Sequence, residues 1–328
     1  IHILELPNMR TCGRCTEKGV PAQLPLLHVQ QKDKWSCGYR NLQILLSAVV
    51  PKLPHDHPYY RPLPASLKRS DIGVAVPIPS LTQLQTFLEK AWTEGFDPKG
   101  AEHYRGRILG EKSQIGAIEV SSLISWLSLD SIVVQFINTE DSRTVLGPFV
   151  WSYFCKYGGQ CYNCSRKSFN PVSCRTSAEL LLHHAVTGTE PEAASCSCPL
   201  LPLYLQWEGH SVTIVGVQRG PKSDGSGFDY DLLVFDPMKD GDHLHKNLSR
   251  AFELESTALA VGPMLQPASQ FREKDCQILM ASVRPLSVAE REKVRLKINA
   301  VTASKEAILK LASGAPRSKE DSGDNLGG

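Results

Sequence analysis

Apolar residues at regular spacing predict three helices in the first half of the chain. Between Leu42 and Val49 they recur at helical spacing after a polar lead-in, so we expect a helix that begins at or next to Cys37. A capping-box pattern, with serine first and glutamine three residues later, predicts a second helix over residues 80–94. A third helix is expected over residues 115–127, with an apolar side that faces inward.

Runs of β-branched and aromatic residues predict the strands. Residues 132–137 form a short apolar run that is typical of a buried strand. Residues 206–217 and 230–237 predict two antiparallel strands, because the segment 219–227 between them is turn-like. Helices that come first and strands that follow predict an α+β fold.

This predicted hairpin brings a histidine and an aspartate to one end. Facing partners in an antiparallel pair have a constant sum of residue numbers. A loop centred near Ser223 therefore places His210 across from Asp236. A carboxylate beside an imidazole fixes its tautomer and stabilises the imidazolium. The alternative for His210 is an ordinary histidine at the end of a strand.

Cys37 is the candidate nucleophile. The unpaired N–H groups and the dipole at a helix N-terminus favour a thiolate, which is the form of cysteine that attacks carbonyls. The alternative is a small buried core cysteine, the usual fate of a free thiol. A matched His210 and Asp236 favour the catalytic interpretation, in which the fold brings Cys37 to them.

Composition and helix signals predict the domain organisation. Residues 1–30 are interpreted as a lead-in to the main domain, which upstream domains could precede. A capping box that starts at Ser287 predicts a C-terminal helix over residues 286–312. Residues 313–328 lack apolar anchors and are expected to be disordered.

The composition of the chain narrows the class of protein. Its 328 residues are 41% hydrophobic and 21% charged, which fits a mostly globular protein with one large domain or two small ones. The net charge of +2 gives no general reason to expect nucleic-acid binding, and no apolar run approaches a membrane-spanning length. A nucleophilic thiol without a visible secretory feature favours a reducing compartment, so we expect the cytoplasm and nucleus.

Six of the ten cysteines lie in residues 155–198, which we interpret as an insertion in the main domain. Cys161, Cys164 and Cys174 are weak candidates for zinc ligands, because their spacing is irregular. The alternative is a variable surface loop with free thiols. We expect no other cofactor.

Two groups of motifs resemble known peptidases. The run from Trp35 to Gln43 resembles the nucleophile motif of the papain-like peptidases of ubiquitin and of the ubiquitin-fold modifier. Residues 209–214 and 235–237 resemble the zinc-finger ubiquitin peptidase (ZUFSP) branch of that group. At Ser36 this chain departs from the family, which usually has glycine there.

Two further segments, residues 91–98 and 115–120, match the same branch. The resemblance covers residues 31–285 apart from the insertion, and it implies that this range is the catalytic main domain. It implies a papain-like cysteine protease fold, in which the helix with the cysteine packs on an antiparallel sheet that carries the histidine and aspartate. It also implies a deubiquitinase that hydrolyses the bond after the C-terminal Gly-Gly of ubiquitin. Ubiquitin and polyubiquitin chains of open linkage type are then the partners.

The resemblance also implies roles for residues around the nucleophile. Gln206 stands at the family position whose side chain contributes to the oxyanion hole, with the backbone N–H of Cys37 as a second donor. Asp97 and Glu119 match positions that face the basic tail of ubiquitin. Trp35 lines the tunnel for Gly-Gly or packs in the core.

Each of these assignments has a structural alternative. Gln206 could be a strand residue that faces solvent, Asp97 a turn former before Pro98, and Glu119 a solvated helix residue.

Two other functions stay open. A protease of the ubiquitin-fold modifier would carry its histidine after Asp-Pro, but Met238 follows Asp236 and Pro237 here. An inactive ubiquitin-binding module is the second alternative, and the intact cysteine, histidine and aspartate argue against it.

Overall fold

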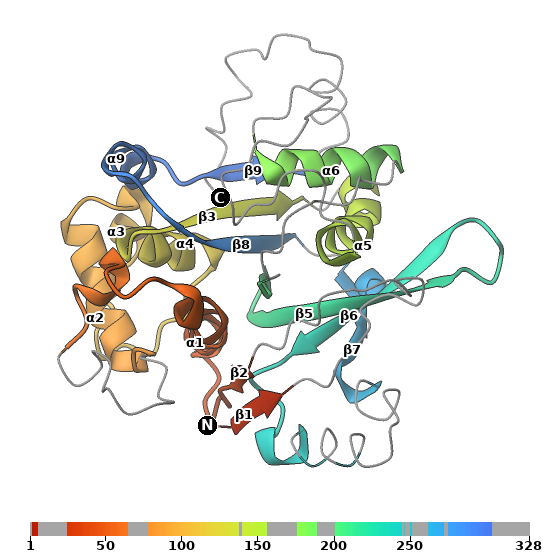
Figure 1. Ribbon diagram of the computed structural model, residues 1–328, viewed down its shortest axis with the longest axis horizontal. Coiled ribbons are helices and arrows are strands. Elements are labelled where there is room, and N and C mark those ends of the chain that lie inside the picture. Colours follow the sequence, from red (N-terminus) through yellow and green to blue (C-terminus); the bar gives the residue numbers. More distant parts are fainter. Residues whose placement is uncertain are drawn as a thin grey trace, which may run out of the picture.

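The computed structural model describes the parts of the chain that build one sheet and the helices around it (Figure 1). These parts are residues 2–5, 25–64, 78–137, 140–155, 176–188, 201–244, 246, 250, 262–271 and 275–303.

A seven-stranded sheet organises the fold, with the strand order β7-β6-β5-β4-β8-β3-β9. Neighbouring strands are antiparallel except for β3 and β9, which are parallel. The strands are β3 (Leu129–Phe136), β4 (Leu203–Trp207), β5 (His210–Pro221), β6 (Phe228–Phe235), β7 (Leu265–Pro267), β8 (Cys276–Pro285) and β9 (Ala300–Thr302). A separate pair joins β1 (His2–Glu5) and β2 (Pro25–His28).

Helices cover both faces of the sheet, and each face has its own apolar core. One core lies under α1, α2 and α4, and the other lies under α5 and α6. The two groups of helices stand on opposite sides of Figure 1. The helices are α1 (Cys37–Val49), α2 (Leu81–Thr93), α3 (Pro98–His103), α4 (Ala117–Trp126), α5 (Glu140–Cys155), α6 (Ser177–Thr187) and α9 (Val288–Leu296).

Alternation along the strands explains how two cores share one sheet. Leu203 and Leu205 of β4 belong to the core under α5 and α6, whereas Tyr204 between them belongs to the core under α1. On β5, Val212 and Ile214 are buried in the α5 core. The residues that alternate with them therefore face α1.

This architecture confirms the predicted α+β, papain-like fold. The helix α1 begins at Cys37 and packs against β5, which begins at His210, while Asp236 directly follows β6. The predicted capping box at the start of α2 is present, since Ser80 and Gln83 exchange hydrogen bonds. Among the described residues, no helix combines the length and the apolar character needed to cross a membrane.

The structure corrects the strand predicted over residues 206–217. The chain turns at Glu208 and Gly209, so that β4 and β5 are two antiparallel strands rather than one. Gly209 has a φ of 79°, which a residue with a side chain rarely adopts. The uniform apolar and β-branched pattern on both sides of the turn concealed this break.

The predicted C-terminal helix over residues 286–312 is also corrected. It starts as expected, with the capping box of Ser287 and Glu290, but α9 ends at Leu296. Residues Ala300–Thr302 then form β9, because they add in parallel to the edge of β3. The last part of the predicted helix lies outside the described residues, as does the tail 313–328.

Candidate active site

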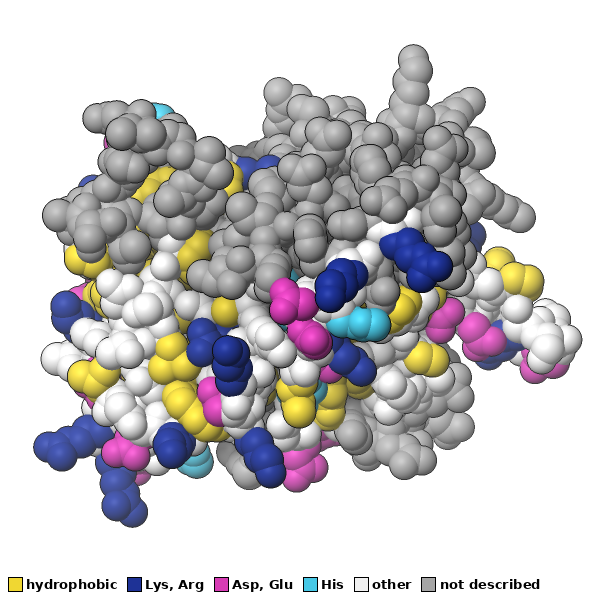
Figure 2. Space-filling model, turned by 90° about the horizontal axis from the view of Figure 1, so that it is seen from below, with side chains coloured by type: hydrophobic (Ala, Val, Ile, Leu, Met, Phe, Trp, Pro, Cys, Tyr) yellow, Lys and Arg dark blue, Asp and Glu magenta, His cyan; other side chains and the backbone are white. Residues whose placement is uncertain are grey.

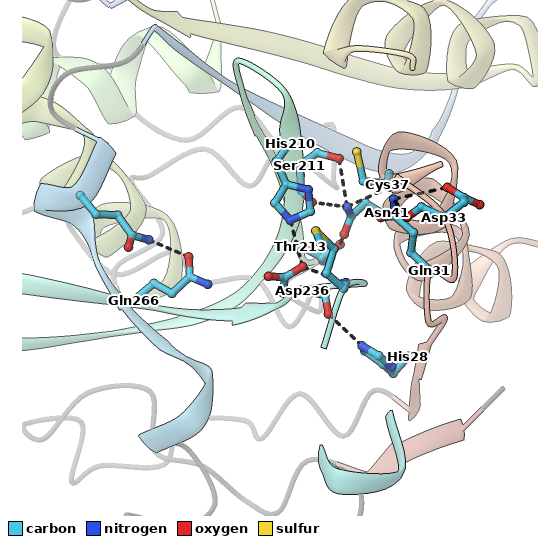
Figure 3. A network of polar contacts seen from close by, with 12 residues as sticks. His28, Gln31, Asp33, Cys37, Asn41, His210, Ser211, Thr213, Asp236 and Gln266 are labelled. Atoms are coloured by element: carbon cyan, nitrogen blue, oxygen red, sulfur yellow. Dashed lines mark hydrogen bonds and ion pairs between the residues drawn. The ribbon is translucent and has the colours of Figure 1, made fainter. Parts of the chain in front are cut away.

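The three predicted catalytic residues lie together where α1 meets the sheet (Figure 3). Cys37 is the first residue of α1, His210 is the first residue of β5, and Asp236 comes directly after β6. The Nε2 atom of His210 lies 2.9 Å from Oδ1 of Asp236. That bond leaves Nδ1 of His210 for Cys37, with which His210 is also hydrogen-bonded. The geometry is that of a nucleophile, a base and a residue that orients the base.

The protonation equilibria of these groups favour a charged arrangement. Burial would raise the pKa of Cys37, but hydrogen bonds from His210 and Ser211 hold that pKa below its ordinary value. Burial would lower the pKa of His210, yet its bonds to Asp236 and Cys37 raise the pKa to about 9. Burial would raise the pKa of Asp236, and the bond from His210 holds it below its usual range. The directions of these three shifts favour a thiolate, an imidazolium and a carboxylate that stabilise one another.

The loop before α1 is held by Asp33, whose role the sequence did not reveal. Its Oδ1 accepts the backbone N–H groups of Trp35 and Ser36 at 2.9 and 2.7 Å, and its Oδ2 accepts the Ser36 hydroxyl at 2.8 Å. Partial burial would raise the pKa of Asp33, but these bonds lower it overall. The serine at position 36 is fully buried, and Asp33 satisfies its hydroxyl group. The departure from the usual glycine is thus accommodated.

Asn41 joins α1 to β5 directly behind Cys37. Its Nδ2 donates to the carbonyl oxygen of Cys37 at 3.0 Å and to that of Ser211 at 2.7 Å. Its Oδ1 accepts the hydroxyl of Thr213 at 2.8 Å. Asn41 is fully buried, so these bonds fix the position of Cys37 relative to the strand that carries His210.

Asn41 and Ser211 were missed as site residues, although a signal exists for both. Asn41 is a polar residue one helical turn after Cys37, directly before the apolar run that starts at Leu42. Ser211 and Thr213 alternate with apolar residues on β5, which places two small polar side chains on the face toward α1.

The segment before α1 also positions the site through hydrogen bonds to the backbone at Asp236 and Pro237. Nε2 of the buried His28 donates to the backbone oxygen of Asp236 at 3.1 Å. The backbone N–H of Gln31 donates to the carbonyl oxygen of Pro237 at 2.7 Å. The backbone on either side of the Asp236–Pro237 bond is therefore fixed from outside the hairpin, as Figure 3 shows for His28.

Gln206 lies on β4 with its side chain at the start of α4. Its Oε1 accepts the backbone N–H of Ala117, the first residue of that helix. Its amide nitrogen is therefore the end available as a donor. The segment before α4 also touches the first turn of α1, because a Cβ added to Gly38 would lie 2.5 Å from the carbonyl oxygen of Ile115. This close approach requires glycine at position 38.

Asp97 and Glu119 both cap helices. Asp97 adopts φ 45° and ψ 69°, and its Oδ1 accepts the N–H of Gly100 at the start of α3. Glu119 accepts the N–H of Gly116 at 2.7 Å before α4. Burial raises the pKa of both carboxyl groups, and the charge of Asp97 also raises that of Glu119. Glu119 is thus half-buried rather than a fully solvated helix residue.

Trp35 is half-buried beside Cys37 in the chain. Its ring packs edge-on against Tyr39 with ring centroids 5.9 Å apart, at the margin of the α1 core. This contact agrees with the packing alternative and leaves part of the ring exposed.

No group of three or more metal-ligating side chains that could hold an ion occurs in the described parts of the chain. The zinc candidates Cys161, Cys164 and Cys174 lie outside the described residues. Within the predicted insertion, residues 177–187 form α6, which packs against α5.

The face of the molecule in Figure 2 carries charges of both signs among neutral and apolar side chains.

Known proteins are similar in sequence to most of this chain. A profile of peptidase family C78 matches residues 25–257. Zinc finger-containing ubiquitin peptidase 1 from Bos taurus is 30% identical over 232 residues, which cover 70% of this chain and 32% of that protein. The Homo sapiens protein of the same name is 28% identical over 282 residues, which cover 85% of this chain and 39% of its own length.

A more distant relative is ubiquitin carboxyl-terminal hydrolase mug105 of Schizosaccharomyces pombe, which is 25% identical over 56% of this chain and 54% of its own. The match with zinc finger-containing ubiquitin peptidase 1 thus spans well under half of that protein. Among solved structures, UfSP from C. elegans covers 79% of this chain and 32% of its own, with a TM-score of 0.37 and 14% identity.

Proposed function

The chain belongs to peptidase family C78, a family of cysteine peptidases, and we propose that it is a deubiquitinase. In this proposal it hydrolyses the bond after the C-terminal Gly-Gly of ubiquitin in polyubiquitin chains. The observation that carries the proposal is the 2.9 Å bond between His210 and Asp236 beside a Cys37 thiol of lowered pKa. The names of the relatives, all ubiquitin peptidases or hydrolases, support the choice of substrate.

Cys37 starts the reaction as a thiolate. It attacks the carbonyl carbon of the last ubiquitin glycine, and the imidazolium of His210 gives its proton to the departing lysine amine. Asp236 keeps the ring oriented and stabilises its positive charge. A water molecule, deprotonated by His210, then hydrolyses the thioester and releases ubiquitin.

Two donors are assigned to the negative oxygen of the tetrahedral intermediate. The N–H of Cys37 lies in the first turn of α1, where backbone N–H groups have no acceptor within the helix. The amide nitrogen of Gln206 is the second donor, because the carbonyl end of that side chain is already bound to Ala117. Both donors lie on elements that α4 holds together.

Asp97 and Glu119 are assigned to the basic tail of ubiquitin. Within the described structure, Oδ2 of Asp97 is buried and has no hydrogen-bond partner. Burial raises the pKa of both carboxyl groups and the charge of Asp97 raises that of Glu119 further, so a cation would stabilise their charged forms. An arginine side chain of the ubiquitin tail is such a cation, and a guanidinium would satisfy the unpaired oxygen.

A protease of the ubiquitin-fold modifier is the second candidate. In that branch the histidine follows Asp-Pro, whereas here Met238 occupies that position and is 59% exposed. The partner of Asp236 is His210 on another strand. This pairing favours ubiquitin. A reducing compartment, the cytoplasm or nucleus, would suit a reactive thiol.

Covalent probes test this proposal. The protein is incubated with ubiquitin and with the ubiquitin-fold modifier, each bearing a C-terminal propargyl group, and labelling is followed by intact mass. We expect ubiquitin to label the wild-type protein and to leave Cys37→Ala unlabelled. Preferential labelling by the ubiquitin-fold modifier would favour the second candidate, and labelling of Cys37→Ala would exclude Cys37 as the nucleophile. Absence of labelling by either probe would support the inactive module.

A further inference from the structure

Ser211 lies next to His210 but faces the other way, toward α1. It is 1% exposed, and in Figure 3 it stands between β5 and the helix start at Cys37. The side chain and the backbone of Ser211 are both hydrogen-bonded to Cys37. The mechanism above leaves these contacts without a role.

Asn41 determines which way the Ser211 hydroxyl group can donate. Nδ2 of Asn41 binds the carbonyl oxygens of Cys37 and Ser211, which can only accept, so this end of the amide is the donor. The same Nδ2 lies 3.1 Å from Oγ of Ser211. Nδ2 has two hydrogens for these three oxygens, so Oγ of Ser211 shares one of them as an acceptor. The hydroxyl hydrogen of Ser211 faces two further groups, the sulfur of Cys37 and the phenol of Tyr204. A thiolate is the stronger acceptor of the two, because it carries a charge.

We propose that Ser211 is a further catalytic residue, whose hydroxyl group donates a hydrogen bond to the thiolate sulfur of Cys37. The proposal rests on the proposed function in one respect, since it takes Cys37 as the nucleophile. Its physical basis is the burial of the sulfur, because Cys37 is only 4% exposed and water cannot solvate the charge freely. His210 stabilises the thiolate from one side and Ser211 from another.

The position of this donor is set by a chain of buried hydrogen bonds. Thr213 binds Oδ1 of Asn41 at 2.8 Å, and Asn41 binds both the backbone and the hydroxyl of Ser211. All of these atoms lie on α1 or β5, two regular elements in direct contact. Ser211 is therefore preorganised for the thiolate rather than free to rotate toward solvent.

The test measures the titration of Cys37 directly, without a ubiquitin substrate. The rate of alkylation of Cys37 by iodoacetamide is followed by peptide mass spectrometry across a pH series for the wild type and Ser211→Ala. Loss of one charge-assisted hydrogen bond should raise the midpoint by about one pH unit, roughly a tenfold loss of thiolate below the midpoint. A midpoint equal to that of the wild type would overturn the proposal.

Ser121→Ala is the matched control. Ser121 is equally buried and shares a 2.9 Å hydrogen bond with Ser131, but it lies on α4. In this variant the midpoint for alkylation of Cys37 should stay at the wild-type value. A shift as large as that of Ser211→Ala would show a general effect of removing a buried hydroxyl, and the proposal would fail.

The isosteric change Thr213→Val is used if Ser211→Ala does not fold. It removes the hydrogen bond that fixes Oδ1 of Asn41 and should raise the midpoint in the same direction by less. An unchanged midpoint would again overturn the proposal. These outcomes are separate from the proposed function, because Cys37 can be titrated whether or not the protein cleaves ubiquitin.

Discussion

His210 and Asp236 are joined by a 2.9 Å hydrogen bond although they are not paired in the β5–β6 ladder. The last pair at this end is Thr213 with Phe235, and a register shift lies between Ile214 and Gly216. The predicted register, with His210 across from Asp236, is therefore wrong, and it is the side chain of His210 that reaches along β5 toward Asp236. The same oxygen of Asp236 also accepts the N–H of Met238 at 2.9 Å, which holds the carboxylate toward the ring.

Changes at these two residues should have unequal effects. His210→Ala removes the proton donor and acceptor, so kcat/KM for ubiquitin–coumarin should fall by on the order of 10²–10⁴-fold. Asp236→Asn keeps a side chain of the same shape that can still contact the ring, and we expect a smaller loss. Steady-state kinetics of both variants measure this, and wild-type rates in either would contradict the assigned roles.

The pH profile of kcat/KM should be bell-shaped and displaced from that of an ordinary thiol. As pH rises, activity appears when Cys37 loses its proton, which occurs below the usual range because its pKa is lowered. Activity should decline again near pH 9, where His210 loses the proton needed by the leaving amine. The two limbs report the coupled titration of Cys37 and His210 as a pair. In Asp236→Asn the upper limb should move to lower pH, and a limb that stays near 9 would show that Asp236 does not support the imidazolium.

The assigned tail site is best tested with substitutions that preserve both helix caps. Asp97→Asn and Glu119→Gln remove charge but retain the oxygen that accepts a backbone N–H, whereas larger side chains would not fit the buried Asp97 position. We expect roughly tenfold lower kcat/KM for ubiquitin–coumarin from the double change, mostly through KM. A short Gly-Gly peptide ester without arginines should be nearly unaffected.

The same site predicts an effect of acid on binding. The raised pKa values of Asp97 and Glu119 mean that these groups become neutral at a higher pH than ordinary carboxyl groups. The KM for ubiquitin–coumarin should therefore rise as pH falls, while the KM for the short ester stays level. Equal responses of both substrates would assign the carboxyl groups to the fold instead.

A methyl group at Gly38 should disturb the site without touching a reacting atom. In Gly38→Ala the new Cβ would meet the carbonyl oxygen and the side chain of Ile115 at 2.5 and 2.7 Å. Such overpacking should cost about 1–3 kcal/mol of unfolding free energy and move the start of α1 away from α4. Thermal unfolding and kcat measure the two effects. Gly220→Ala is the control, because nothing lies within 4 Å of its added Cβ.

Local patterns explain which parts of this fold were predictable. The start of α2 follows from Ser80 and Gln83 because a capping box lies within one helical turn. The start of α1 at Cys37 follows from a change between polar and apolar spacing. The end of α9 at Leu296 did not follow, because it depends on β9 pairing with a strand more than 160 residues earlier.

The candidate site likewise contains residues that the sequence made predictable and residues that it did not. Cys37, His210 and Asp236 were predictable as side chains that chemistry requires, and the structure brings all three together. The roles of Asp33 and Asn41 were not, because each depends on hydrogen bonds whose geometry exists only in the folded loop and helix. Their side chains alone are common in loops and helices.

The bonds from His28 and Gln31 have a practical consequence for dissecting the protein. His28 contacts the backbone of a residue 208 positions later. The segment before the main domain therefore helps to hold the predicted catalytic aspartate in place. A fragment cut just before Lys32 would retain Cys37 and all its predicted partners, yet release the backbone at Asp236. Loss of activity in such a fragment would come from the lost bonds at Asp236 and Pro237, not from the catalytic residues themselves. A cut before residue 25 keeps both bonds.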